Sequence, residues 1–280
     1  MPRFRNTNII INFDESIVRA EDTTTKQMVY TADPAKAARQ WETDVLFCLE
    51  SIYANGRVGR MLFDAIGLDG ADPLLGSYTR YLVIQPYTPE QEKKSLCNAN
   101  AGPTDWGLAQ TRTRLDNTAN QNKGVGSSTI IRYDKARWIN GTKCGRFGTQ
   151  PGGVFHEVLM HEMLHGLRQM AGQMDMSPLP NGWTTMEEFY AILIVNVAMS
   201  ERGKKVLRKN HTGFTPLEPN LSTSVGFLTD PNHLKWVNWL HSRNAVLFSK
   251  VAQVDAKFNP IREFITNLPA WQVMLANPPK

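Results

Sequence analysis

The 280-residue chain lacks any long apolar run. A membrane-spanning helix needs roughly 18 or more consecutive apolar residues, and the nearest stretch, 189–199, is shorter and is interrupted by Asn196. The N-terminus carries Arg3 and Arg5 but only a short apolar segment at 9–11, well below the apolar core of a secretory signal. The sequence therefore predicts no membrane span and no conventional signal peptide, and it indicates a protein that is cytoplasmic at synthesis.

Cysteine is scarce: the chain has Cys48, Cys97 and Cys144, and no two of them form a Cys-x-x-Cys pair. That absence excludes the zinc knuckles and redox couples that are built on such pairs. We expect free thiols in a reducing compartment. The alternative is a disulfide between Cys97 and Cys144, since both lie in loop-like sequence.

Positive charge is in slight excess but is not concentrated. Lys and Arg number 31 against 26 Asp and Glu, a formal net charge of +5, and the basic residues are scattered. A nucleic-acid-binding surface normally needs clustered basic residues. The sequence therefore predicts no nucleic-acid partner. With 41% hydrophobic and 20% charged residues, the composition is that of an ordinary globular protein with a substantial core.

The residue patterns predict a mixed set of strands and helices. Short β-branched or alternating apolar runs predict strands at 8–13, 81–84 and 129–133, with a Thr-rich turn at 23–25. Apolar residues that recur every three or four positions predict helices at 33–52, where Asp33 and Pro34 form the start, and at 58–66, 154–170, 185–201 and, broken near Pro260, 231–268. The polar segment 98–126 is expected to be a long surface loop.

These elements place the chain in the α+β class, mostly helical with a small sheet. Residues 1–120 are expected to contribute an N-terminal strand and helices. They are expected to pack on a core formed by residues 121–280, all within one compact domain.

The helix predicted at 154–170 contains the motif His161-Glu162-Met163-Leu164-His165. An α-helix turns by about 100° per residue, so the two histidines lie about 40° apart on one face and can bind the same ion. Zinc prefers such nitrogen ligands, and a catalytic zinc site needs one further protein ligand and a water. Glu162 projects beside this face, where it can act as general base on that water. His156 begins a similar pair but has no histidine at its fifth position.

An alternative is that this polar stripe faces solvent on a surface helix. The alternative function is a non-catalytic helical binding or structural protein, in which the metal is absent or only braces the helices and the stripe faces solvent or a partner. The stripe consists of Glu157, His161, His165, Arg168 and Gln169.

The helix predicted at 185–201 is apolar on all sides after its first turn, so it must be buried and its initial carboxylates need partners. Two registers of a capping box are open. If Thr184 caps the helix with Glu187, Glu188 is available as the third metal ligand. If Thr185 caps it with Glu188, Glu187 is left for the metal. We expect the first register.

His161-Glu162-x-x-His165 followed by Glu188-Phe189-x-Ala191 resembles the zincin peptidases whose third zinc ligand is a glutamate, such as thermolysin-like enzymes, aminopeptidases and anthrax lethal factor. The resemblance aligns the downstream glutamate of these enzymes with Glu188. It implies a Zn2+ site formed by His161, His165 and Glu188.

A closer resemblance, over roughly residues 124–214, is to bacterial effector metallopeptidases of the NleD type, which are compact zincins delivered into host cells. It includes the segments 196–203 and 207–211. The resemblance implies a zincin-like fold with a small mixed sheet whose edge strand precedes the motif helix. A peptide substrate would lie antiparallel to that strand, at 129–133. It also implies a virulence effector or toxin secreted by a dedicated system, with secretion machinery or a chaperone as partner.

A zincin also needs a donor for the oxyanion that forms during peptide hydrolysis. His211 is the first choice and Arg208 the second, because both follow the acidic helix within the stretch that resembles the effectors. Tyr133 and Tyr190 are weaker choices. The prediction is a zinc-dependent endopeptidase acting on a protein or peptide substrate, with Glu162 as base and His211 as oxyanion donor.

Overall fold

The computed structural model describes residues 4–5, 7–13, 34–69, 80–88, 91, 97, 99–109, 126–139, 142, 144–211, 213–243 and 245–276. The expected turn at 23–25 and the helix start at Asp33 lie outside these residues. The described chain is α+β and mostly helical, with a small mixed sheet, as predicted. None of its described helices is both long enough and apolar enough to cross a membrane.

The described residues form two compact units. One comprises residues 1–52, 62–149 and 153–175, and the other comprises 53–61, 150–152 and 176–280. The motif helix and the sheet belong to the first unit, and the helix predicted at 185–201 belongs to the second.

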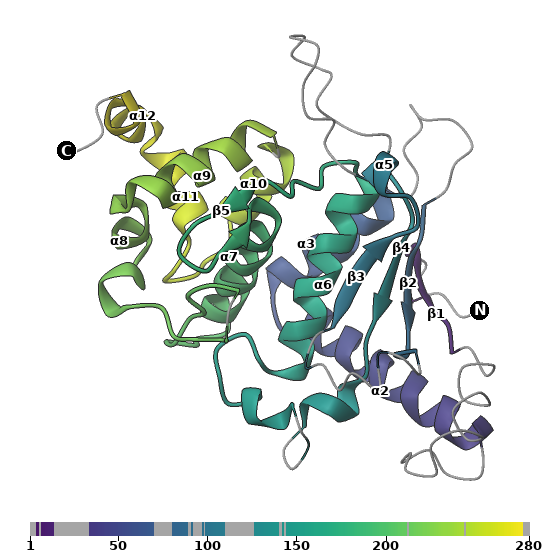
Figure 1. Cartoon of the computed structure of the whole chain (residues 1–280). Helices are drawn as coiled ribbons and strands as arrows, with labels where there is room; N and C mark the ends of the chain where they lie inside the picture. Colours follow the sequence, from purple (N-terminus) through teal and green to yellow (C-terminus); the bar gives the residue numbers. More distant parts are fainter. Residues whose placement is uncertain are drawn as a thin grey trace. The chain divides into compact units, whose positions relative to one another are not determined.

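The sheet of the first unit contains parallel and antiparallel strands (Figure 1). β1 (Ile9–Ile11) pairs in parallel with β2 (Leu82–Gln85), and β2 pairs in parallel with β4 (Thr129–Arg132). β3 (Asn100–Pro103) pairs antiparallel with β4, so the strand order is β1-β2-β4-β3. Buried and half-buried residues alternate along β2 and β4, because successive side chains of a strand point to opposite faces.

The strand that precedes the motif helix is not an edge strand. β4 pairs with β2 on one side and with β3 on the other, so the expectation that residues 129–133 form the edge is wrong. β3 is the edge strand next to it. β3 and the short helix α5 (Trp106–Ala109) both lie in the segment predicted as a loop. Asn-Ala-Gly-Pro has little strand propensity of its own, so pairing with β4 is what makes it a strand.

The motif helix α6 (Phe155–Met170) packs across β2, β3 and β4. All residues from Glu157 to Met170 are buried. Gly166 permits the close approach to the sheet: a β-carbon added there would lie 2.7 Å from Cδ1 of Leu82 and 3.4 Å from Cγ2 of Thr129. The sheet therefore fixes the position of α6 and of the residues that it carries.

A buried tyrosine connects α6 to the N-terminal helices. The Tyr133 hydroxyl donates to the Phe155 carbonyl at 2.9 Å, and the Tyr133 carbonyl accepts from Nε1 of Trp41 at 3.0 Å. Burial raises the pKa of Tyr133 well above its ordinary value, so the hydroxyl remains a neutral donor. The other helical elements before α6 are α2 (Pro34–Ala54), α3 (Arg57–Asp69), η2 (Lys135–Trp138) and η3 (Gly145–Phe147).

The second unit contains the buried helix α7 (Met186–Glu201). Every residue of α7 from Phe189 to Ser200 is buried, as predicted from its apolar character on all sides. Phe189 packs in a ring cluster with centroid distances of 4.9–6.1 Å to its neighbours, which are Trp183, Phe227, His233 and Trp236. The remaining elements are β5 (Pro178–Leu179), β6 (Thr184–Thr185), η4 (Pro219–Leu221), α8 (Ser224–Thr229), α9 (Pro231–Arg243), α10 (Ala245–Ala252), α11 (Pro260–Thr266) and α12 (Leu268–Ala276).

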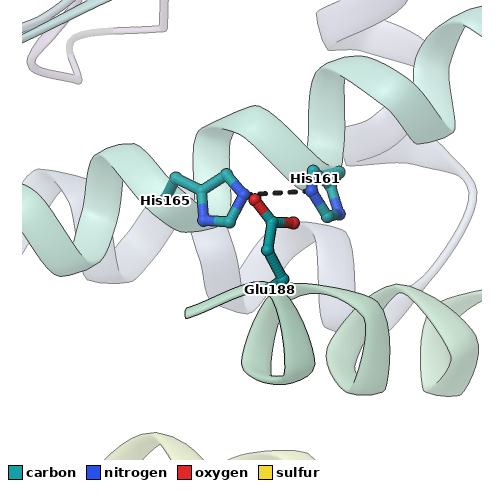
Figure 2. A group of neighbouring side chains, drawn as sticks. All are labelled: His161, His165 and Glu188. Carbon is teal, nitrogen blue, oxygen red and sulfur yellow. Dashed lines mark hydrogen bonds between the residues drawn. The ribbon is translucent and has the colours of Figure 1, made fainter. Parts of the chain in front are cut away.

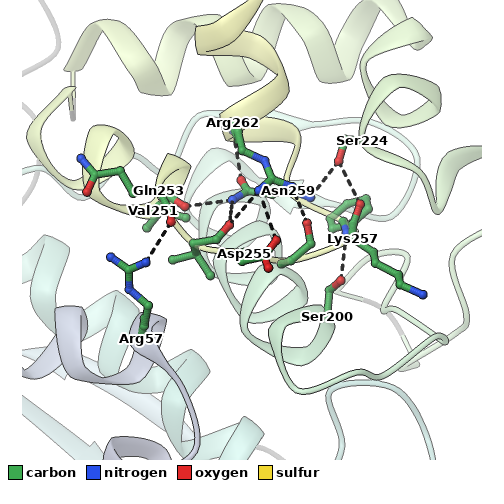
Figure 3. A network of polar contacts seen from close by, with 12 residues as sticks. Arg57, Ser200, Ser224, Val251, Gln253, Asp255, Lys257, Asn259 and Arg262 are labelled. Carbon is green, nitrogen blue, oxygen red and sulfur yellow. Dashed lines mark hydrogen bonds and ion pairs between the residues drawn. The ribbon is translucent and has the colours of Figure 1, made fainter.

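A polar network holds the segment between α10 and α11 (Figure 3). Asn259 is fully buried, and its Nδ2 donates to the carbonyls of Val251 and Val254 at 2.9 Å and 3.1 Å. Its Oδ1 accepts the Arg262 backbone N–H at 3.0 Å, which caps α11. Asn259 therefore both starts α11 and joins it to the residues at and after the end of α10.

Two of the three cysteines are paired. Cys97 and Cys144 form a disulfide, with Cα atoms 5.3 Å apart. The expectation of free thiols is therefore wrong for these two residues, and the alternative pairing is confirmed. Cys48 is a buried free thiol on α2, and its burial raises its pKa to about 12.

Candidate metal centre

His161 and His165 lie one turn apart on α6, and their Nε2 atoms point toward each other (Figure 2). They are buried, at 5% and 6% exposure, and their Nε2 atoms are 3.0 Å apart. Two nitrogens bound to one zinc at about 2.0–2.1 Å in tetrahedral geometry are about 3.3 Å apart. The two imidazoles are therefore close to the spacing that a shared ion requires.

The polar stripe of α6 does not face solvent. Glu157, Arg168 and Gln169 are 0%, 3% and 2% exposed, as buried as the histidines. The alternative of a surface helix is therefore wrong. Burying so many polar groups along one helix is unfavourable unless each has a partner, so the stripe must serve internal contacts.

α7 begins at Met186, with Thr185 as its N-cap residue. Thr185 Oγ1 accepts the backbone N–H of Glu188 at 3.3 Å. The register expected from the sequence, with Thr184 capping Glu187, is wrong by one residue, and Thr184 instead has a φ of 66°. Glu188 contributes only its backbone N–H to the cap. Whether its carboxylate can be a metal ligand is therefore decided by where that carboxylate lies, and not by which threonine caps the helix.

Glu188 nevertheless lies with the two histidines. One potential ligand atom from each of His161, His165 and Glu188 falls within 4.8 Å of the other two (Figure 2). Two imidazole nitrogens and a carboxylate oxygen are a donor set that zinc takes in catalytic sites, with a further position for water. The residues therefore fit a zinc ion. Glu187 and His156 are outside this group.

Glu162 follows His161 on α6 and is held by the sheet. Its Oε2 accepts the backbone N–H of Ala101 in β3 at 2.8 Å, and the residue is only 7% exposed. Gln169 holds the same strand residue, because its Nε2 donates to the Ala101 carbonyl at 3.1 Å. These contacts of Ala101 could not be predicted from the sequence, since nothing in the segment 100–103 indicates a strand.

His211 lies close to Glu188. Its Nε2 is 3.6 Å from Glu188 Oε2, its Nδ1 is 3.4 Å from Thr184 Oγ1, and its side chain is 38% exposed. Arg208 is buried, and its guanidinium donates to the carbonyls of Asn210 and His211 at 2.9 Å and 2.8 Å. Of the two predicted oxyanion donors, His211 is therefore near the group, whereas Arg208 supports the loop that carries His211.

The two weaker candidates for the oxyanion donor are tyrosines in the protein interior. Tyr133 and Tyr190 are both fully buried, and the Tyr133 hydroxyl bonds to the start of α6. Neither is in the group of potential ligands. An oxyanion donor must be accessible to the substrate, so the partly exposed His211 is favoured over both tyrosines.

Comparison with known proteins gave no match: no family model, no curated protein and no solved structure matches this chain. The resemblance to zincins and to effector metallopeptidases therefore stays a prediction from the sequence.

Proposed function

We propose that this chain is a zinc-dependent endopeptidase that hydrolyses peptide bonds of a protein substrate. In this proposal His161, His165 and Glu188 hold Zn2+, and Glu162 is the general base. The observation that supports it most is the grouping of the two imidazoles and the Glu188 carboxylate within 4.8 Å, with Glu162 on the same turn of α6. A zinc that only braced helices would normally be enclosed by four protein ligands, whereas this group offers three and leaves a position for water.

The chemistry divides between the ion and the side chains. Bound zinc supplies a Lewis acid and lowers the pKa of a coordinated water. Glu162 takes a proton from the attacking water and delivers it to the leaving amine, while the Ala101 N–H holds its carboxylate. His211 donates to the oxyanion that develops on the substrate carbonyl. Burial of the histidines and of Glu162 strengthens these electrostatic interactions.

The proposal extends to a zincin-like fold. It is supported by the motif helix lying across a mixed sheet and by the antiparallel edge strand β3, next to which Glu162 lies. Delivery as a bacterial effector or toxin stays a prediction from the sequence resemblance.

The first test is metal content. We expect one zinc per chain in the purified protein, lost when His161 or His165 is replaced by Ala. Failure to bind a stoichiometric amount of zinc after loading would contradict the proposal.

The second test separates a catalytic ion from a bracing one. Glu162→Gln is expected to keep the zinc and the fold and to abolish cleavage, because it removes only the base. Cleavage is measured by comparing new protein termini in a proteome treated with the parent or with Glu162→Gln, which also identifies the substrate. Zinc binding without any difference between the two samples would favour a non-catalytic protein.

A further inference from the structure

The backbone of Ala101 points away from the rest of the sheet. In an antiparallel pair, residues alternate between those that bond to the partner strand and those that do not. Thr104, the residue after β3, donates its N–H to the carbonyl of Ser128 at 2.8 Å. Counting back in steps of two, Gly102 and Asn100 bond to β4. The N–H and carbonyl of Ala101 therefore lie on the outer side of β3.

Side chains of α6 form hydrogen bonds with both of these outward groups, the N–H and the carbonyl of Ala101. Glu162 accepts the Ala101 N–H at 2.8 Å, and Gln169 donates to the Ala101 carbonyl at 3.1 Å. Gln169 is itself fixed, because its Oε1 accepts from Thr129 Oγ1 in β4 at 2.7 Å. Thr129, Gln169, Ala101 and Glu162 are 0%, 2%, 8% and 7% exposed. A buried chain of hydrogen bonds thus runs from β4 to the Glu162 carboxylate.

We propose that Ala101 is a positioning residue for the peptidase reaction: its backbone N–H fixes the Glu162 carboxylate, and Gln169 fixes Ala101. This inference rests on the proposed function, since it takes Glu162 as the general base. A carboxylate accepts hydrogen bonds through two oxygens, so a bond to Oε2 orients the group without exhausting its capacity as a base. Displacing a catalytic group by about 1 Å can lower a rate roughly 100-fold, so such a restraint has a large effect.

The same arrangement limits what β3 offers to a substrate. A peptide that adds to a sheet edge needs outward N–H and carbonyl groups. Both groups of Ala101 are engaged, and Pro103, the next outward residue, has no N–H. β3 therefore has no outward N–H for a substrate strand, and its outer side serves the general base instead.

The experiment is a proline scan of β3 in the full chain. Ala101→Pro removes the N–H that binds Glu162 but no bond to β4, and proline is already tolerated two residues later. We expect kcat to fall about 10- to 100-fold, with KM, zinc content and melting temperature close to those of the parent. Ala101→Gly, which restores the N–H, is expected to recover the lost rate. Gly102→Pro is the matched control, because it removes a bond to β4 and should lower the melting temperature.

A folded, zinc-loaded Ala101→Pro with parental kcat would overturn the inference. If that variant does not fold, amide hydrogen exchange in Glu162→Ala decides. The Ala101 amide should exchange faster than in the parent while the Gly102 amide does not change, and equal exchange at Ala101 would contradict the inference. Failure of the proposed function looks different. The parent and Glu162→Gln would then give the same protein termini, whereas the result of the exchange measurement would not change.

Discussion

Glu187 and Glu188 begin the same helix, but only Glu188 lies with the histidines. Glu188→Ala is expected to weaken zinc binding by more than about 100-fold, because losing even an outer partner of a ligand costs about 10- to 100-fold. Glu187→Ala removes the same charge at a neighbouring buried position and should keep the metal. Competition with a chromogenic zinc chelator measures both affinities. A larger loss in Glu187→Ala would reverse the assignment.

His233 should make stability depend on pH. Burial lowers its pKa below the ordinary value of 6.5, and this effect outweighs the opposing charge of Asp230. The ring stacks on Phe227 with centroids 4.2 Å apart. Below about pH 6.5 the unfolded chain binds more protons at this residue than the folded chain, so the free energy of unfolding falls as the pH decreases.

The variant His233→Phe removes this titration and keeps an aromatic ring. The denaturant midpoints of parent and variant should differ by a constant amount above about pH 7.5, and the difference should shift in favour of the variant between about pH 6.5 and 5. Urea titrations at several pH values measure this shift. Parallel pH profiles would show that His233 does not contribute to the acid sensitivity.

At the level of elements, α11 depends on its capping residue. Asn259→Ala removes the cap and leaves the carbonyls of Val251 and Val254 without this donor, so we expect the free energy of unfolding to fall by about 2–4 kcal/mol. Asn267→Ala is the matched control, because Asn267 is exposed and its Nδ2 donates to Oε1 of Glu263 at 2.8 Å. Its effect should be within about 0.5 kcal/mol. Equal effects in urea unfolding would contradict this account.

Most helices could be predicted from the sequence because their apolar spacing is local information. The helices predicted at 154–170 and 185–201 agree with α6 and α7 to within one residue. β3 could not be predicted, since Asn-Ala-Gly-Pro becomes a strand only by pairing with β4. The α7 cap has the alternative register, with Thr185 and not the expected Thr184, because the two residues are equally suitable by type and the backbone conformation decides between them.

For the molecule as a whole, the predictable part of the site is the part carried by one helix. His161, Glu162 and His165 are placed by helical geometry, which the sequence determines directly. Ala101 lies 61 residues away from Glu162 in the chain, and only the completed sheet brings its N–H to that carboxylate. Contacts of this kind depend on tertiary structure, so no local sequence pattern predicts them.

The disulfide should make a large contribution to stability that a reductant removes. Cys97 and Cys144 are 47 residues apart, and closing a loop of that length lowers the entropy of the unfolded chain by an amount worth about 4 kcal/mol. Urea unfolding with and without a reductant should show a loss of this order. Cys144→Ser should unfold like the reduced parent and be insensitive to reductant. Alkylation of the denatured, unreduced protein should label Cys48 alone, since it is the one free cysteine among the described residues, and labelling of all three thiols would rule out the bridge.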